Sequence, residues 1–191
     1  MADVAEVTQT LQRGTVSDVT RVLGRREMKR WRNGDRTALS LALTNRSPAD
    51  RLAICHLLLD RGADASFVLE FDNVGALHLL FSHEPHDYVG EKELAARLID
   101  AGADVNLVSP RFGSPLASLA ATFKFSDATL QPFYDVLIES GKLNLSTVDK
   151  GGRTMMENIA VKVRKRASLY QQLIDFAIAS GQQEAIPPTE G

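Results

Sequence analysis

The chain has 191 residues, of which 44% are hydrophobic and 24% charged, with 22 basic and 24 acidic side chains. These values exclude a chain that is disordered throughout and argue against a pair of large domains, and the net charge of −2 argues against dominant binding to nucleic acid or to an anionic membrane. One cysteine, Cys55, excludes an internal disulfide, and the sequence shows neither a secretory signal nor an apolar membrane-spanning run, so we expect a cytoplasmic protein.

The N-terminal part, residues 1–30, mixes short apolar positions with basic side chains, and we expect it to form a capping repeat. Basic residues gather around Trp31, at Arg21, Arg25, Arg26, Lys29, Arg30, Arg32 and Arg36. Such a run could contact phosphates beside a stacking ring, but Asp18, Glu27 and Asp35 interrupt or flank it. We interpret it as the solvated surface of a cap; the alternatives are a basic protein-docking patch and a nucleic-acid site.

Two markers recur along the rest of the chain with almost the same spacing. The first is a glycine after an apolar run, at Gly62, Gly102, Gly141 and Gly181. The second is a short polar residue or glycine before an apolar pair, at Thr37, Gly75, Ser114 and Thr154. Two independent markers with one period of about 39 residues indicate internal repeats, which are the signature of stacked architectures.

Each marker has a physical explanation. The residues of the second marker belong to the set that caps helix N-termini, and Thr154 with Glu157 has the spacing of a capping box. Pro115 would then occupy the first helical position. The glycines lie where a chain leaves a helix through a left-handed residue. Each period therefore predicts a cap, a helix, a second helix, a glycine stop and an extended stretch.

These segments resemble the ankyrin repeat, which reads roughly Gly-x-Thr-Pro-Leu-His-x-Ala and then Leu-Leu-x-x-Gly-Ala-Asp-Val-Asn. The similar stretches here are Gly34 to Ala42, Ala76-Leu77-His78 and Gly102-Ala103-Asp104-Val105-Asn106. The resemblance implies an all-α, ankyrin-like solenoid of stacked helix pairs with extended hairpin fingers. It also implies that His78 forms a structural hydrogen bond between repeats.

The expected organisation is one domain over residues 1–181 and a flexible tail over residues 182–191. Its units are the capping repeat 1–30 and the repeats 31–67, 68–106, 107–145 and 146–181. Because the ankyrin period is about 33 residues, we place the extra residues in loops between the two helices, at 44–50, 82–93 and 123–131. We expect the exposed end repeats to carry charge, at the N-terminal arginines and at Lys162, Arg164, Lys165 and Arg166.

Candidate catalytic groups are few. His83 and His86 are three apart and straddle Pro85, which breaks the helix that a paired-histidine metal site needs, so we expect a solvated loop and no metal. Cys55 and His56 are adjacent, and neighbours on a helix do not face each other. We therefore expect Cys55 to be a small core residue. No phosphate-binding loop or nucleophile elbow is present, and we predict no enzymatic activity, no cofactor and no small-molecule substrate.

The finger segments carry the predicted binding site. The resemblance implies that the fingers and first helices form a concave binding face, and aromatic and arginine residues on a rigid scaffold are typical binding hot spots. The candidates are Phe67, Glu70, Phe71, Asp72, Asn73, Leu107, Arg111, Phe112, Asp149, Lys150 and Arg153. The alternative for each aromatic is that it packs beneath its finger as core. Secondary candidates lie in the inter-helix loops, at His83, His86, Tyr88 and Phe125.

The predicted function is therefore non-catalytic binding of a protein partner, which the chain inhibits or neutralises by occupancy. The alternatives are an adaptor that tethers its partner and, less favoured by the charge balance, nucleic-acid binding through Arg21–Arg36. Small bacterial ankyrin proteins of this kind are similar to immunity proteins, so the partner could be a cognate toxin or enzyme. We expect no membrane partner.

Overall fold

The computed structural model describes residues 3–188 and is mostly helical, with 56% helix and 6% strand. Its contacts divide the chain into two compact units, residues 1–104 (unit 1) and 105–191 (unit 2). The all-α class is therefore confirmed at this coarse level. Whether the repeats form one domain over residues 1–181 stays a prediction. Within residues 3–188, no helix combines the length and the apolar composition that crossing a bilayer requires.

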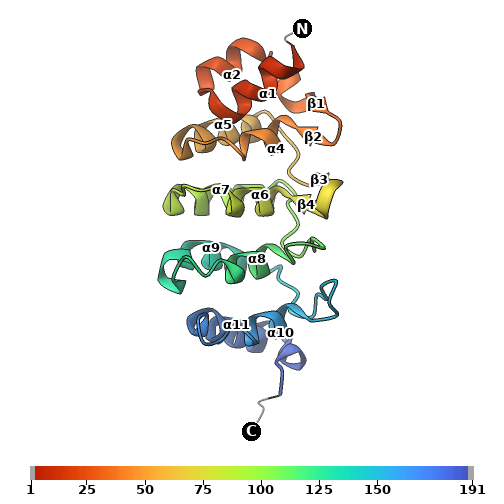
Figure 1. Cartoon of the computed structure of the whole chain (residues 1–191), viewed down its shortest axis with the longest axis vertical. Helices are drawn as coiled ribbons and strands as arrows, with labels where there is room; N and C mark the ends of the chain where they lie inside the picture. The colour runs from red at the N-terminus through yellow and green to blue at the C-terminus, as the bar shows by residue number, and fades with distance from the viewer. Residues whose placement is uncertain (1–2, 189–191) are drawn as a thin grey trace. The chain divides into compact units, whose positions relative to one another are not determined.

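Unit 1 consists of three helical layers joined by hairpins (Figure 1). The first layer pairs α1 with α2, the second pairs α4 with α5, and the third pairs α6 with α7; α1 contacts α4, α2 contacts α5, and α5 contacts α7. The bounds are α1 Val4–Arg13, α2 Val16–Val22, α3 Glu27–Arg30, β1 Arg32–Asn33, β2 Arg36–Thr37, α4 Ala38–Ala42, α5 Pro48–Asp60, β3 Val68–Leu69, η1 Phe71–Asn73, β4 Val74–Gly75, α6 Ala76–Ser82 and α7 Tyr88–Asp100.

Unit 2 repeats the same plan in two layers. Helix α8 packs against α9 and α10 against α11, while α8 contacts α10 and α9 contacts α11. The bounds are α8 Pro115–Ala121, α9 Asp127–Glu139, α10 Met155–Ala160, α11 Ala167–Ser180 and the 3₁₀ helix η2 Gln183–Ala185. Each of the four predicted repeats thus contains one short helix followed by one longer helix.

The helix starts follow the predicted capping chemistry. The side chains of Thr37, Ser114 and Thr154 each accept a hydrogen bond from a backbone N–H of the first turn, and Thr154 forms its capping box with Glu157. Gly75 has no side chain to contribute, and the Nδ1 of His78 accepts a hydrogen bond from Gly75 N at 3.4 Å, which satisfies the N–H of the cap residue itself. The predicted caps are therefore confirmed.

The helix ends are also as predicted. Gly62, Gly102, Gly141 and Gly181 have φ angles of 77°, 102°, 66° and 74°. Positive φ strains residues that carry a Cβ, so glycine ends these helices cheaply. Ala65, which follows the turn at Gly62, donates a hydrogen bond of 3.1 Å from its N to the O of Ala101, which directly precedes Gly102, and this bond connects two layers of unit 1.

The core of each unit lies between its helical layers. Fully buried side chains in unit 1 include Leu11, Leu39, Ile54, Leu58, Leu77, Leu94 and Leu98, and those in unit 2 include Leu116, Leu130, Phe133, Leu137, Ile159, Leu169 and Leu173. Each helix pair exposes apolar surface on both of its broad sides, so burial against the neighbouring pair supplies most of the stability.

Two predictions about connections are wrong. The loops between paired helices span only residues 43–47, 83–87 and 122–126, because the residues expected to extend them form the first turns of α5, α7 and α9. The predicted flexible tail begins too early, because Gln182 donates from Nε2 to Leu143 O and accepts from Leu145 N. Residues 183–185 then form η2, and the last part of the tail, 189–191, lies outside the described residues.

Candidate functional site

Two antiparallel hairpins project from unit 1. In the first, Arg32 pairs with Thr37 and Asn33 with Arg36. In the second, Val68 pairs with Gly75 and Leu69 with Val74, and η1 forms the turn between them. The second hairpin contains the predicted finger residues Glu70 to Asn73.

The second hairpin carries a highly exposed aromatic side chain. Phe71 is 79% exposed, more than any other aromatic side chain among the described residues. Behind it, Asp72 and Asn73 adopt left-handed backbone angles (φ 63° and 52°), a conformation that Asp and Asn tolerate better than most residues. Glu70 N donates a hydrogen bond of 2.8 Å to Asp35 Oδ2 of the first hairpin. The turn therefore exposes Phe71 on a backbone that is hydrogen-bonded to the first hairpin.

Phe67 does not belong to this surface. Its side chain is only 7% exposed and packs under the hairpin, whereas the following Val68 is 40% exposed. Because side chains alternate across an extended segment, the position before an outward residue faces inward. The prediction that Phe67 contacts a partner is wrong, and the alternative that it is a core residue holds.

Unit 2 carries a second pair of hairpins. In the first, Ser109 bridges to Gly113, and the buried Ser109 hydroxyl accepts hydrogen bonds from Arg111 N and Phe112 N. The Arg111 guanidinium carbon lies 5.1 Å from the centre of the Phe112 ring, within the range of a cation–π contact. Both side chains are exposed, while Leu107 is half-buried.

The last hairpin uses one of its predicted binding residues for its own structure. Asp149 Oδ1 accepts hydrogen bonds from Gly151 N and Arg153 N, and Oδ2 accepts one from Asn158 Nδ2 at 2.9 Å. The Asn158 bond, followed by those from the backbone, lowers the pKa of Asp149. Asp149 therefore shapes the turn, and Lys150 and Arg153 remain as its exposed charged side chains.

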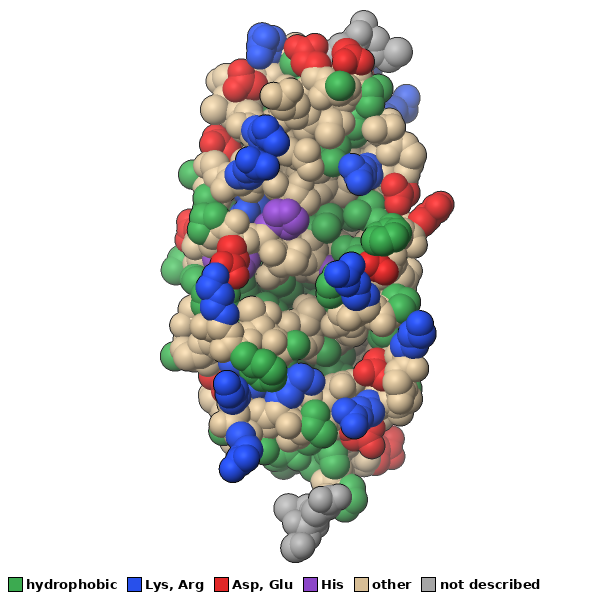
Figure 2. Space-filling model, viewed as in Figure 1, with side chains coloured by type: hydrophobic (Ala, Val, Ile, Leu, Met, Phe, Trp, Pro, Cys, Tyr) green, Lys and Arg blue, Asp and Glu red, His purple; other side chains and the backbone are tan. Residues whose placement is uncertain are grey.

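The exposed binding candidates therefore lie at the tips of three different hairpins. The structure brings together Glu70, Phe71, Asp72 and Asn73 in unit 1, and within unit 2 it places Arg111 and Phe112 on one hairpin and Lys150 and Arg153 on another. Sequence reasoning missed Val68 and Val148, which are 40% and 52% exposed on hairpin arms. The sequence signal that could have identified them is the alternation of outward-facing and inward-facing side chains along each hairpin arm. Figure 2 shows hydrophobic side chains reaching the viewed surface in small groups among charged ones.

The histidine cluster is not the solvated loop that we predicted. The His86 side chain is 3% exposed, and its Nδ1 lies 2.6 Å from Oε2 of Glu91 in α7. Glu91 is fully buried and also pairs with the fully buried Arg51 of α5. His83 is half-buried, and burial lowers its pKa. His86 therefore belongs to a buried polar network with Glu91 and Arg51, while His83 contacts Ser82 and the Leu79 carbonyl.

The other secondary candidates also have structural contacts. Tyr88 belongs to α7, and its ring centre lies 5.2 Å from that of His86. Phe125 is half-buried, and its carbonyl accepts a hydrogen bond of 2.9 Å from Arg166 Nη1. Arg166 is 1% exposed, so the prediction that it is one of the solvated charges of the C-terminal repeat is wrong.

The cysteine and histidine pair offers no reactive thiol. Cys55 is fully buried, and burial raises the pKa of its thiol well above the ordinary value. His56 Nδ1 lies 2.7 Å from Arg97 Nη1 on the next layer, and burial, followed by the charge of Arg97, lowers its pKa. The prediction that Cys55 is a small core residue is confirmed. Among the described residues, no group of three or more His, Cys, Asp or Glu side chains could hold a metal ion.

Comparisons with known proteins bear on the fold alone. No family model matches the sequence, and no curated protein matches it. The chain is similar in structure to a functionally unknown protein from Leptotrichia buccalis C-1013-b, with a TM-score of 0.68 and 19% sequence identity over 92% of this chain and 94% of that one. That similarity extends along nearly the whole of both chains.

Proposed function

We propose that the chain is a non-catalytic, ankyrin-like binding protein of the cytoplasm that recognises a protein partner through its hairpin tips and inhibits it by occupancy. The observation that carries the proposal is the exposure of Phe71 on a braced turn. Exposing a phenylalanine ring to water is unfavourable, and its burial in a partner's pocket would recover that free energy. The rigid turn would lower the entropic cost of binding.

The order of elements supports the ankyrin-like part of the proposal. A hairpin, a short helix, a five-residue loop and a longer helix recur at α4–α5, α6–α7 and α8–α9. The third hairpin, in unit 2, also ends in an aromatic side chain, Phe112, beside Arg111. Aromatic and arginine side chains are the residue types that most often dominate protein interfaces.

The test begins with affinity capture of partners from the native host and continues with the purified partner in calorimetric titrations. Phe71→Ala should weaken binding by about 1–4 kcal/mol because it removes a hot-spot ring. Ile178→Ala is the matched control, because Ile178 is an apolar side chain that is 57% exposed on α11 and does not belong to a hairpin. Equal binding by the two variants would contradict the proposed site.

A functional assay of the captured partner then distinguishes inhibition from tethering. If the chain is an inhibitor, the partner's own activity should fall in proportion to the fraction bound, and Phe71→Ala should restore it. A partner that keeps full activity in a stoichiometric complex would contradict inhibition and would show that the chain tethers it.

A further inference from the structure

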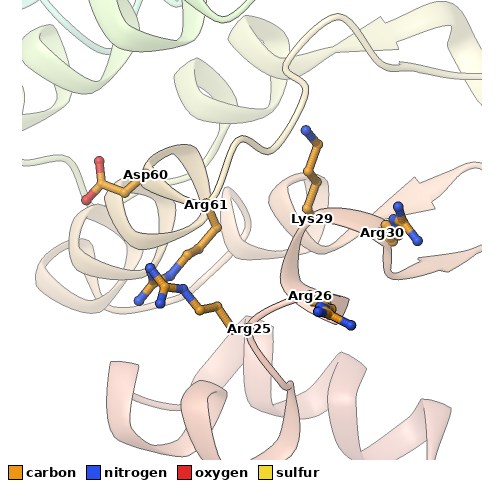
Figure 3. A pocket seen from close by; sticks show the side chains of 6 residues that line it. All are labelled: Arg25, Arg26, Lys29, Arg30, Asp60 and Arg61. Atoms are coloured by element: carbon orange, nitrogen blue, oxygen red, sulfur yellow. The ribbon is translucent and has the colours of Figure 1, made fainter.

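A strongly basic pocket lies in unit 1, away from the tip that carries Phe71. It is lined by Arg25, Arg26, Lys29, Arg30, Asp60 and Arg61 and has a volume of about 500 Å³ (Figure 3). The first four residues come from α3 and the turn before it, and the last two from the end of α5. The sequence could not associate Arg61 with the other cations, because the fold alone brings the end of α5 to them.

None of the five cations of this pocket forms an ion pair within the described part of the chain. No ion pair within 4.0 Å and no side-chain hydrogen bond engages Arg25, Arg26, Lys29, Arg30 or Arg61. The nearby carboxylates bind elsewhere: Glu27 Oε2 accepts from Gly24 N at 2.9 Å, and Asp60 pairs with Arg97 at 2.5 Å. Lys29 lies beside Gly62, where its charge also contributes to lowering the pKa of Asp64.

Arg61 shows most directly that the pocket is incomplete. Its Nε is buried and has no hydrogen-bond partner, although buried donors are almost always paired. Figure 3 shows the side chains of Arg25 and Arg61 pointing toward one another. Guanidinium groups that point toward one another repel each other, and the carbonyl end of the α5 dipole and the nearby Asp60 offset part of this repulsion. An anion between them would remove the repulsion.

We propose that this pocket binds a small anion that carries two or more phosphate groups. Four of the five cations are arginines, whose planar guanidinium groups match phosphate oxygens with paired hydrogen bonds. Five positive charges around one cavity balance the several negative charges of a polyphosphate better than the single charge of a carboxylate. The volume lies in the range of small-molecule sites, roughly 300–1,000 Å³.

The pocket favours a compact anion over a nucleic acid. The cations line one concave site, whereas a strand requires a groove or stripe along which successive phosphates bind. The overall charge of −2 would also repel a long polyanion that extended beyond the pocket. The proposal is independent of the hairpin-tip interaction, because Phe71 does not line the pocket.

Titration of the full-length chain with inorganic tripolyphosphate tests the proposal. Binding is read by calorimetry and by the fluorescence of Trp31, the single tryptophan, which follows Arg30 directly. We expect saturable one-to-one binding that weakens as salt rises. The double variant Arg25→Gln/Arg61→Gln should raise Kd by at least about tenfold, because it removes two charge-assisted donors.

The matched control is Arg46→Gln/Arg164→Gln, which removes the same charge from two exposed arginines outside the pocket. It should leave Kd within about twofold of wild type, since distant exposed charges are screened. Equal losses in both double variants, or no saturable binding at low salt, would overturn the proposal. Circular dichroism checks that both variants keep the helical content of wild type.

Two further probes identify the kind of phosphate ligand. If a nucleoside triphosphate binds more tightly than tripolyphosphate, the pocket also contacts a base or sugar; equal affinity means that it recognises the phosphates alone, and either result supports the proposal. A single-stranded oligonucleotide that binds while tripolyphosphate does not compete with it would overturn the proposal in favour of a nucleic-acid site.

Discussion

Each unit contains a short loop between paired helices that is held by a fully buried arginine. In unit 1, Arg51 donates to Pro85 O of the loop 83–87, to Asn45 O at 2.8 Å and to Glu91. In unit 2, Arg166 donates to the carbonyls of Ala120, Thr122 and Phe125 in and before the loop 122–126, and to Asp127 at 3.2 Å. In both places a guanidinium satisfies backbone carbonyls that no helix pairs.

The two sites differ in how the counter-charge is held. Glu91 is 0% exposed and is shared between Arg51 and His86, so the unit 1 site is a closed network of three ionisable groups. Asp127 is 15% exposed, and it also accepts hydrogen bonds from Ser168 N, Leu169 N and Tyr134 Oη. The unit 2 carboxylate therefore keeps backbone partners and some water when its arginine is lost.

This difference indicates that the stability lost on replacing a buried arginine depends on the surroundings of the carboxylate that loses its partner. Removing one partner of a fully buried pair leaves an uncompensated charge, whereas a carboxylate near water can be hydrated again. Replacing the buried arginine should therefore destabilise the protein more in unit 1 than in unit 2, although Arg51 and Arg166 are equally buried.

The largest expected effect follows from Arg51→Leu. It removes the cation that faces the buried Glu91, whose other side-chain contact is with His86, and it leaves the carbonyls of Asn45 and Pro85 without this donor, so the free energy of unfolding should fall by about 3–5 kcal/mol. Urea denaturation followed by Trp31 fluorescence measures this change in unit 1. The double variant Arg51→Leu/Glu91→Leu should recover part of the loss, because two apolar side chains leave no buried charge. A double variant less stable than the single one would contradict a charge-based explanation.

A smaller effect should follow from Arg166→Leu. Its carbonyl partners lose their donor, but Asp127 keeps three other hydrogen bonds, so we expect a loss of about 1–3 kcal/mol. Urea denaturation followed by far-ultraviolet circular dichroism measures it, because Trp31 lies in unit 1. A loss as large as that of Arg51→Leu would mean that counter-charge burial does not govern the difference between the units.

The contrast between local and distant interactions also explains what could be predicted from the sequence. Thr37, Ser114 and Thr154 were predicted correctly as helix caps, because a cap is decided within three or four residues. The left-handed glycines are equally local. Periodic caps and stops are therefore sufficient to predict a helix pair in each repeat from α4–α5 to α10–α11.

The buried arginines could not be predicted, because their partners are distant in the sequence. Arg166 meets Ala120, and Arg51 meets Glu91, only after the layers stack. A charged residue in a sequence is normally solvated, so burial of these two contradicts the ordinary expectation. His86 was assigned to a solvated loop for the same reason, since its partner Glu91 is itself buried by other elements.

The hairpin candidates were only partly predictable, unlike the helix caps, which were predicted, and the buried arginines, which were not. The sequence placed Phe67 and Phe71 in one finger, but which of the two faces outward depends on where the strands begin to pair and how the turn bends. The 3₁₀ turn Phe71–Asn73 depends on left-handed angles at Asp72 and Asn73, neither of which is a glycine. Phe71 therefore stays a candidate, while Phe67 is core.

The smallest expected effect concerns acid and again separates the two loops. All four histidines lie in unit 1, and His83 is in its loop 83–87, so the loop 122–126 has no group that titrates between about pH 5 and 7. Burial disfavours the charged imidazole and lowers the pKa of His83 below its ordinary value of 6.5, although the Leu79 carbonyl opposes the shift. Between the folded-state pKa and 6.5, the unfolded chain binds more protons than the folded one.

The stabilising contribution of the neutral His83 should therefore be complete above pH 6.5 and disappear as pH falls through that window. Lowering the pH from about 7.5 to about 5.5 should increase hydrogen exchange, corrected for its intrinsic pH dependence, in the loop 83–87 and leave the loop 122–126 unchanged. Nuclear magnetic resonance titration of the His83 ring provides the direct check. A midpoint at or above that of free histidine would mean that the loop already admits water at His83, and the closed network would then be confined to Arg51, Glu91 and His86.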